Sequence, residues 1–157
     1  MCIRDRLNQA LNNSRGIQSV SFVTHSMGAM VVRRALAEQA PWQQRLTLRR
    51  HLMIFPPNQG SRKADRWQPN PVARWVMGPA LTELTTSSAP RVPAPRYPFA
   101  VIAGARDKTV RPLEAGFNGA DDFILLDVEH SFGMNSPEVI NAAICYLKTG
   151  RLTPNGG

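Results

Sequence analysis

Apolar residues along this chain form short continuous runs that alternate with segments of helical spacing. From Ile17 to Val23 apolar residues, two of them β-branched Val, occur on both parities, which predicts a strand buried on both faces of a parallel sheet. From Met27 to about Gln39 apolar positions recur every three or four residues, which predicts a helix closed by Pro41. Residues 17–39 are therefore expected to form a strand, a sharp turn and a helix.

Three later segments show the same strand pattern. His51–Phe55, Phe99–Gly104 and Phe123–Val128 are short apolar runs bounded by turn residues. Strands that alternate with helical segments are typical of a parallel sheet covered by helices. The predicted fold class is α/β, with about four parallel strands and flanking helices.

The last helix has start and stop signals of its own. Ser136 is suited to the N-cap, Pro137 to the first helical position and Gly150 to the position past the end. The apolar residues between them predict one buried stripe, made of Val139, Ile140, Ala143, Ile144 and Leu147.

Residues 61–98, between the second and third predicted strands, are rich in Pro and contain two of the three Trp residues. This segment is too long for a tight connection, so we expect a Pro-rich cap inserted over the edge of the sheet. Its large apolar residues are expected to fill a core or, if the cap covers a site, to form an apolar acyl-binding wall; they are Trp67, Trp75, Met77 and Leu81.

The 157 residues are expected to form a single domain, residues 1–157. The opening M-C-I-R-D-R resembles a read-through tag, so residues 1–6 are expected to be non-native. Cys145 then remains, and we expect a small buried thiol on the last helix. Neither a disulfide framework nor a membrane span is predicted.

The formal net charge is +8. Such a balance can indicate contact with nucleic acid or with an anionic membrane, but the Arg residues are scattered and no aromatic residues interleave with them. A solvated basic surface is favoured, and no nucleic-acid partner is predicted.

The stretch V-T-H-S-M-G places Ser26 between the first predicted strand and its helix. A neutral Ser hydroxyl is a poor nucleophile, so it needs an imidazole to take its proton and a carboxylate to orient that imidazole. Asp107 follows the third predicted strand and His130 follows the fourth. Because ligands of open parallel sheets bind outside the carboxyl ends of the strands, the three side chains are expected to meet there.

Each of these residues also has a simpler interpretation. Ser26 could be a helix N-cap, Asp107 a turn residue and His130 a loop histidine bonded to backbone. Competing acids are Glu114, Asp121 and Asp122, deep in the loop, and Asp127, placed inside the fourth predicted strand.

Two other histidines and one turn complete the candidate residues. His25 and His51 are expected to pack or hydrogen-bond, and Gln59-Gly60-Ser61 could be a plain loop or a turn flanking the pocket. Without H-E-x-x-H or a Cys pair, no metal site is predicted.

Four segments together carry a family resemblance: V-T-H-S-M-G-A-M, F-P-P-N-Q-G-S, V-I-A-G-A-R-D-K-T-V and V-E-H-S-F-G-M-N-S-P-E-V. With them, the chain from Ile17 to Leu152 resembles the C-terminal half of an α/β-hydrolase-fold serine hydrolase of the bacterial lipase/esterase type. The resemblance implies Ser26 as nucleophile, Asp107 as acid, His130 as base and the Met27 N–H as an oxyanion donor. It implies hydrolysis of a small-molecule or lipid carboxylic ester through an acyl-enzyme, with no cofactor.

The chain departs from the family pattern in two places. Thr24 stands where the G-x-S-x-G elbow has its first Gly. The family's early strand and H-G pair, which supply the second oxyanion donor, have no counterpart, so we expect a truncated domain with weak or no activity. Alternatives are an acyltransferase or thioesterase with the same triad, and a catalytically dead binding module. Substrate, oligomeric state and compartment stay open, with the cytoplasm only slightly favoured.

Overall fold

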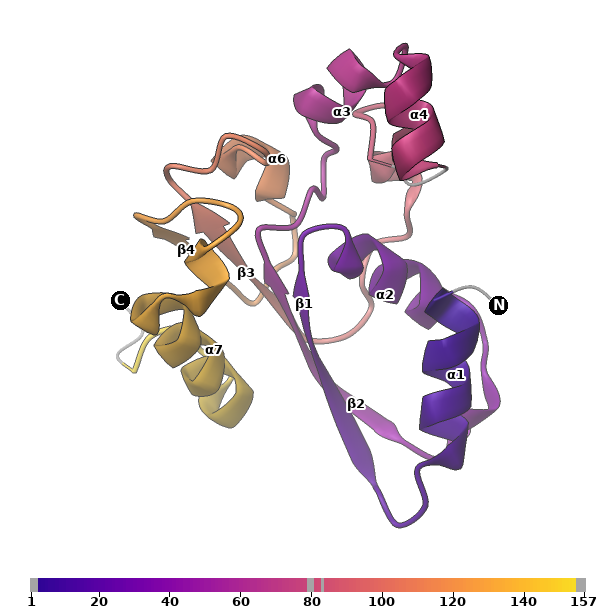
Figure 1. Ribbon diagram of the computed structural model, residues 1–157. Coiled ribbons are helices and arrows are strands. Elements are labelled where there is room, and N and C mark those ends of the chain that lie inside the picture. Colours follow the sequence, from indigo (N-terminus) through magenta and orange to yellow (C-terminus); the bar gives the residue numbers. More distant parts are fainter. Residues whose placement is uncertain (1–2, 79–80, 83, 155–157) are drawn as a thin grey trace.

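Four parallel strands, in the order β1-β2-β3-β4, form the centre of the molecule. The structure is a computed structural model that describes residues 3–78, 81–82 and 84–154 (Figure 1). Met1 and Cys2, within the segment predicted to be a tag, lie outside these residues. The parallel sheet with its flanking helices confirms the predicted α/β class.

The strands are β1 (Ser19–His25), β2 (Thr47–Ile54), β3 (Phe99–Gly104) and β4 (Asp122–Leu126). The prediction was correct to the residue for β3, two residues early for β1 and four residues late for the start of β2. The start of β2 was missed because its polar residues carry no apolar run, although Thr47 and Leu48 already pair with β1. Asp127 lies beyond the end of β4, so its predicted place inside the strand was wrong.

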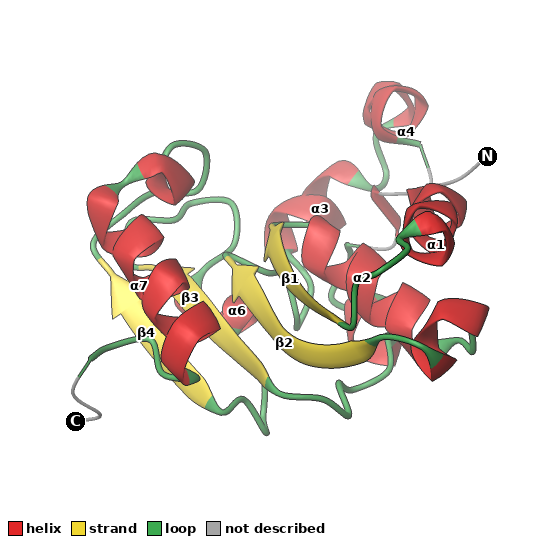
Figure 2. Cartoon of the chain, turned by 90° about the horizontal axis from the view of Figure 1, so that it is seen from below, coloured by secondary structure: helices red, strands yellow, loops and turns green. Residues whose placement is uncertain are grey.

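Helices cover both faces of the sheet, with α7 on one side and α2 on the other (Figure 2). The helices are α1 (Ile3–Asn13), α2 (Gly28–Ala37), α3 (Arg62–Trp67), α4 (Pro71–Met77), α6 (Pro112–Ala115) and α7 (Pro137–Thr149). Three 3-10 turns, η1 (Pro41–Gln44), η2 (Ala89–Arg91) and η3 (Gly133–Asn135), lie in the connections. No helix in the described ranges is both long and apolar enough to cross a membrane.

The core on each face follows from the two-residue period of the strands. Leu52 and Ile54 of β2 face α7 and pack in one cluster with Tyr146. Met53, between them, points to the other face and packs with Ala29 of α2. Both parities are buried along the whole of β3, which is apolar throughout, and in β2 only from His51 to Ile54.

Helix α7 begins and ends where its signals predicted. The Ser136 hydroxyl accepts a bond from the Val139 N–H at 3.3 Å, and Gly150 ends the helix in the left-handed region at φ 84°. The predicted stripe was wrong in part, because the buried positions are Val139, Ala142 and Tyr146 while Ile140 and Ile144 are exposed. Tyr146 takes the inward arc, where its ring is fully buried.

Cys145 also departs from its prediction. It is half-buried rather than buried, since it stands next to the inward-facing Tyr146 on the helix.

Strand β1 forms one edge of the described sheet. It pairs with β2 alone among the described strands, and Val23 is 49% exposed although Phe22 beside it is buried. Helix α7 packs over the neighbouring strands and leaves this part of β1 uncovered. The predicted burial of this strand on both faces was therefore wrong.

The scattered charges predicted a solvated basic surface, but Arg33 is not part of one. Its guanidinium is buried and donates to Asn58 Oδ1 at 2.9 Å and to the Val92 carbonyl at 2.8 Å. It also lies 4.3 Å from the centre of the Phe117 ring. Burial lowers the pKa of this guanidinium to about 10. Arg33 thus ties helix α2 to the end of the segment between β2 and β3.

Buried His51 of β2 makes folding stability sensitive to acid. Its Nε2 lies 2.8 Å from the Thr24 hydroxyl, and burial, followed by the charge of Arg33, lowers its pKa from 6.5 to about 3. Between those values the unfolded chain binds a proton that the folded chain does not, so stability present above pH 6.5 is lost as the pH falls. We expect a loss of up to about 1.4 kcal/mol per pH unit in that window.

Urea unfolding at pH 7 and pH 5 measures this loss. His51→Gln keeps an acceptor for Thr24 but does not titrate, so its stability should change less between the two values. An equal loss in both proteins would contradict the assignment to His51.

Candidate active site

Ser26 occupies the turn between β1 and α2 in a conformation unusual for its residue type. Its φ is 53°, in the left-handed region, which costs a residue with a Cβ about 1–2 kcal/mol. The turn is held by the Ser26 N–H, which donates to the Ile54 carbonyl at 2.9 Å. The N-cap of α2 is Met27, so the alternative of Ser26 as N-cap was wrong. The Ser26 hydroxyl does not cap helix α2.

The Ser26 hydroxyl oxygen lies 2.9 Å from Nε2 of His130, and Nδ1 of His130 lies 2.6 Å from Oδ2 of Asp107. Ser26 follows β1, Asp107 follows β3 and His130 follows β4. The structure thus brings all three predicted residues into one hydrogen-bonded row beyond the carboxyl ends of the strands. In this arrangement Nε2 can take a proton from the hydroxyl while a carboxylate holds the Nδ1–H.

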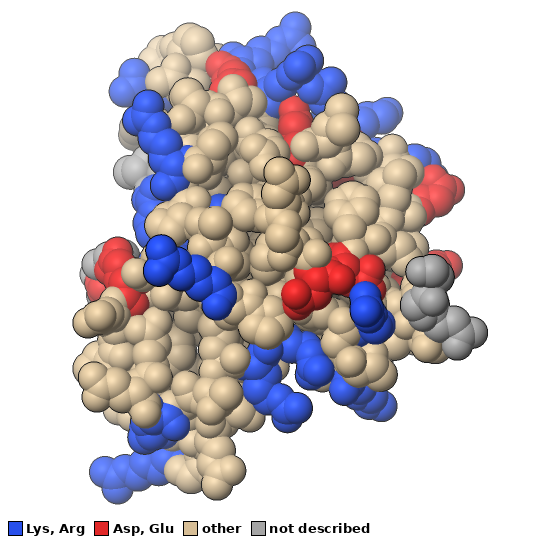
Figure 3. All heavy atoms as spheres, turned by 180° about the vertical axis from the view of Figure 1, so that it is seen from behind, with Lys and Arg blue, Asp and Glu red and all other residues tan. Residues whose placement is uncertain are grey.

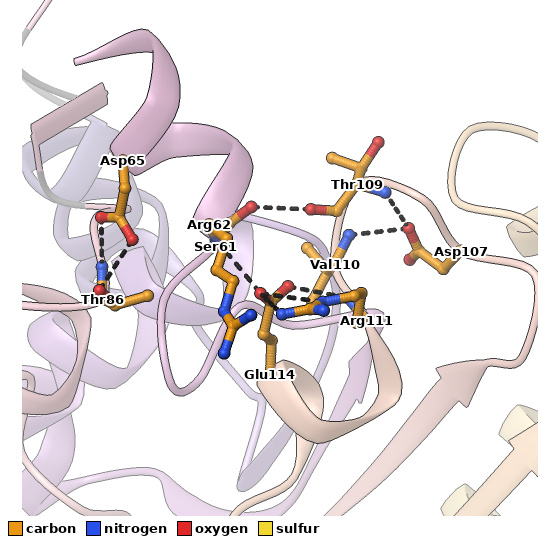
Figure 4. Close-up of polar contacts among 9 residues, drawn as sticks. All are labelled: Ser61, Arg62, Asp65, Thr86, Asp107, Thr109, Val110, Arg111 and Glu114. Atoms are coloured by element: carbon orange, nitrogen blue, oxygen red, sulfur yellow. Dashed lines mark hydrogen bonds and ion pairs between the residues drawn. The ribbon is translucent and has the colours of Figure 1, made fainter. Parts of the chain in front are cut away.

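Asp107 is fixed by its own loop. Its second oxygen, Oδ1, accepts bonds from the Thr109 N–H at 2.7 Å and the Val110 N–H at 2.8 Å (Figure 4). The residue is buried. These two bonds orient the carboxylate and leave Oδ2 for the imidazole of His130.

The four competing acids have other partners. Asp121 accepts from the Tyr146 hydroxyl at 3.3 Å, Asp122 from the Leu152 N–H at 2.7 Å and Glu114 from the Arg111 N–H at 2.9 Å. Asp127 pairs with Arg106 at 2.9 Å on the surface. Of the five candidates, Asp107 is the one that contacts the imidazole.

A small aromatic cluster supports the His130 ring. The ring of His25 lies 5.0 Å from that of His130, and its Nε2 is 3.1 Å from the His130 carbonyl oxygen. Buried Phe55 lies 6.0 Å from the His130 ring, and a Cβ on Gly133 would meet the Phe55 ring at 2.9 Å and displace it. Burial lowers the pKa of His25, and the hydrogen bond to the His130 carbonyl opposes this. The predicted hydrogen-bonding role of His25 is confirmed.

Thr24 replaces the first Gly of the family's elbow without disrupting the turn. Its hydroxyl is bonded to His51, and a Cβ on Gly28 would lie 3.7 Å from the Thr24 Cβ. Since 3.7 Å is an ordinary van der Waals contact, the Thr24 side chain does not crowd this turn. The sequence gave no sign of the bond between Thr24 and His51, which lie 27 positions apart.

The backbone N–H of Met27 sits at the start of α2. No acceptor for it occurs in the part of the chain that the structure describes. The N–H groups of the first helical turn lack partners within the helix, so they can bind an anion. The role of Met27 as an oxyanion donor stays a prediction.

A cavity of about 310 Å³ lies beside Ser26, and its lining is largely apolar. The residues that line it are Ser26, Pro57, Ser61, Lys63, Ala64, Trp67, Leu81, Leu84, Thr109 and Val110. Most of them belong to residues 61–98, here called the cap segment, so this segment forms one side of the cavity.

The apolar lining of this cavity differs in part from the acyl-binding wall predicted from the sequence. Trp67 and Leu81 line it, whereas Trp75 is 85% exposed and neither fills a core nor lines this cavity. The side chain of Met77 lies outside what is described. Leu84 and Val110 were not anticipated, and the T-E-L and K-T-V triplets that contain them gave no signal of a cavity.

The first residue of the cap segment, Ser61, is hydrogen-bonded to the loop that carries Asp107. The Ser61 hydroxyl donates to the Thr109 carbonyl at 2.7 Å, and Asp65 accepts from the Thr86 N–H at 2.9 Å (Figure 4). Gly60 has φ 83°, and a Cβ there would lie 2.4 Å from the Thr86 Cα. This close approach holds the beginning and the return of the segment together. The predicted turn at Gln59-Gly60-Ser61 therefore flanks the cavity through Ser61.

In the described ranges no group of three or more His, Cys, Asp or Glu residues could hold a metal ion. The lining of the cavity contains no such set either.

The sequence matches no protein-family model, and no curated protein sequence compared with it is detectably similar. Its fold is similar to several solved structures. A metagenomic carboxyl esterase aligns over 81% of this chain with a TM-score of 0.67 and 16% identity. A mature lipase of Bacillus licheniformis aligns over 94% of this chain and 70% of its own, with a TM-score of 0.63 and 14% identity.

An α/β-hydrolase enzyme from the metagenome of Moroccan lagoon sediments aligns over 94% of this chain and 68% of its own, with a TM-score of 0.57 and 17% identity. The present chain spans about half of the metagenomic carboxyl esterase, 49% of its length. At these identities the likeness concerns the fold. Together with the parallel sheet and its flanking helices, it shows that this chain forms part of an α/β-hydrolase fold.

Proposed function

We propose that Ser26, His130 and Asp107 are the catalytic triad of a serine hydrolase that cleaves carboxylic esters. The observation that carries this proposal is the continuous row of contacts, 2.9 Å from Ser26 to His130 and 2.6 Å from His130 to Asp107. The turn that holds Ser26 at positive φ supports it, because strained conformations of this kind occur at functional sites. Fold likeness to esterases and a lipase points the same way.

In the proposed reaction His130 removes the hydroxyl proton of Ser26 through Nε2 as the oxygen attacks the ester carbonyl. Asp107 holds the Nδ1–H and stabilises the imidazolium that forms. The tetrahedral intermediate collapses, the alcohol leaves with the proton from His130, and an acyl-enzyme remains on Ser26. Water activated by His130 then releases the acid.

The Met27 N–H would donate one hydrogen bond to the developing oxyanion. A second donor would come from a part of the hydrolase that this chain does not contain, in line with its coverage of 49% of the esterase. The absence of one such donor costs about 2.7–4 kcal/mol, or roughly 10²–10³ in rate. The chain alone is therefore proposed to react slowly, with the triad intact.

The cavity supports an ester with an apolar group as substrate. Apart from Lys63 and the hydroxyl-bearing residues, its wall is apolar, and its volume of about 310 Å³ lies at the lower end of ordinary ligand pockets. A small-molecule ester, or a lipid ester that inserts part of one chain, fits this description.

Trapping the acyl-enzyme tests the proposal on the chain as it stands. A p-nitrophenyl ester or a fluorophosphonate should add one acyl or phosphonyl group, and mass spectrometry of the peptides should locate it on Ser26. Modification elsewhere, or none under conditions where the protein is folded, would exclude the hydrolase and favour a binding module. Transfer of the trapped acyl group to added alcohol in preference to water would identify an acyltransferase.

His25 is proposed to position the His130 backbone through the bond from its Nε2–H to the His130 carbonyl. His25→Phe keeps a ring but removes the donor, so we expect the acylation rate to fall about fivefold, equivalent to about 1 kcal/mol for one hydrogen bond. His25→Gln retains an N–H group and should keep most of the rate. Stopped-flow acylation measures both, and an equal loss in the two variants would contradict a role for the bond.

A further inference from the structure

The cap segment exposes large apolar side chains and buries small ones. Helices α3 and α4 pack through Ala64 and Ala73, which form a cluster with Leu81. Trp75 and Val72, by contrast, are 85% and 66% exposed, and about half of Trp67 is exposed. The usual inward apolar face of a surface helix is therefore reversed on this pair.

Basic residues surround these apolar side chains. Residues 62–75 contain four cations and one acid, a net charge of four minus one, or +3; the cations are Arg62, Lys63, Arg66 and Arg74. The single acid, Asp65, already accepts two hydrogen bonds from Thr86. Figure 3 shows Lys and Arg side chains at the upper end of the molecule, which α3 and α4 form.

This surface projects from the sheet, and within it Arg74 and Trp75 also line a hollow of about 470 Å³. In Figure 1, α3 and α4 stand above the carboxyl ends of the strands, away from α7 and α1. A projecting end with exposed Trp and cations suits a fluid surface that can take up apolar groups between anionic headgroups. Trp is the residue that prefers such an interface, because its ring is apolar and its N–H is polar.

The surface also reaches the cavity beside Ser26. Lys63 and Trp67 line that cavity while both are exposed to solvent. A lipid surface in contact with α3 would therefore lie at the entrance of the cavity.

We propose that the cap surface, made of Trp67, Val72 and Trp75 with Lys63, Arg66 and Arg74, docks onto an anionic phospholipid surface. The apolar side chains enter the region between headgroups, and the cations contact lipid phosphates. The docking does not depend on the chemistry proposed for Ser26, so it is tested by binding alone. A protein with an inactive Ser26 would still bind.

Co-sedimentation with sonicated vesicles tests the proposal. The chain should bind vesicles of phosphatidylcholine and phosphatidylglycerol at least tenfold more tightly than pure phosphatidylcholine, and the difference should shrink at high salt. Trp75→Gln and the pair Arg66→Gln and Arg74→Gln should each weaken binding at least fivefold. Matched controls are Ile144→Gln and Arg151→Gln, exposed residues outside the cap segment, which should bind like the wild type.

Quenching by brominated lipids is a second readout on the unmodified chain. Trp fluorescence should be quenched by brominated anionic vesicles. Trp75→Phe should lose part of that quenching and the double variant Trp67→Phe, Trp75→Phe nearly all of it, because Trp42 is buried. No preference for anionic vesicles, unchanged binding of Trp75→Gln, or an equal loss in the controls would overturn the proposal. Self-association through this surface, detected by sedimentation velocity and abolished by Trp75→Gln, would also overturn it.

Discussion

Replacing Ser26 by Ala is expected to abolish acylation and to lower ester hydrolysis by about 10⁴-fold or more, to the level of the buffer. The hydroxyl oxygen is the only atom of the proposed triad that bonds to substrate carbon, and it lies 2.9 Å from the imidazole that would activate it. Hydrolysis of an activated p-nitrophenyl ester measures the fall. Mass spectrometry should show no acyl group on the variant.

Ser26→Gly is the informative control for this experiment. Both variants lack the hydroxyl, but Gly adopts φ near 53° without strain, so it should be about 1 kcal/mol more stable than Ala there. Equal inactivity with different stability would separate chemistry from folding. Residual hydrolysis within tenfold of the wild type in either variant would contradict Ser26 as the nucleophile.

Asp107→Asn is expected to lower the acylation rate by about 10³–10⁴-fold with little loss of fold. An amide can still accept bonds from Thr109 and Val110, but it no longer stabilises the imidazolium and can present an N–H to Nδ1 of His130. The imidazole would then carry its proton on Nε2, where it cannot accept one from Ser26. Stopped-flow acylation at neutral pH measures this change.

Asp127→Asn is the matched control for Asp107. Asp127 also follows a strand of the sheet, but it is exposed and bonded to Arg106. Its variant should react within twofold of the wild type, since surface ion pairs contribute little. If Asp127→Asn were as slow as Asp107→Asn, or if Asp107→Asn kept its rate, the assignment of the acid would be wrong.

The sequence predicted the elements whose ends carry local signals. Helix α7 lies between Ser136 and Gly150 as expected, because a hydroxyl cap, Pro137 and a left-handed Gly act within a few residues. Strand β3 was predicted to the residue, since it is buried on both faces and apolar throughout. Local chemistry was sufficient in these two places.

Features that depend on distant packing were not predicted. Tyr146 rather than Ile144 faces inward on α7 because its side of the helix packs against β2 and β3. Arg33 is buried because its guanidinium donates hydrogen bonds to Asn58 and to the Val92 carbonyl. Neither partner is near in sequence. Helical spacing predicts that a helix has an apolar stripe but not which side of the helix faces the sheet. The sequence also gives no sign that a charged side chain will find a buried hydrogen-bond partner.

At the candidate active site, too, some features were predicted from the sequence and others depend on distant packing. Sequence order and the rule for the carboxyl ends of parallel strands selected Ser26, Asp107 and His130, and the structure places them in contact. Their catalytic roles stay a proposal until the variants are measured. The bonds that orient Asp107 and the ring packing around His130 depend on a loop conformation and on Phe55, which no sequence pattern specified.

The edge position of β1 has a consequence for handling the protein. Ser19–His25 presents one row of backbone amides and carbonyls to β2 and the opposite row away from it, with Val23 uncovered. Such an edge recruits any extended chain, including a neighbouring copy, and so favours precipitation at high concentration. Co-expression with a polypeptide that supplies a strand beside β1 should therefore improve the yield of monodisperse material.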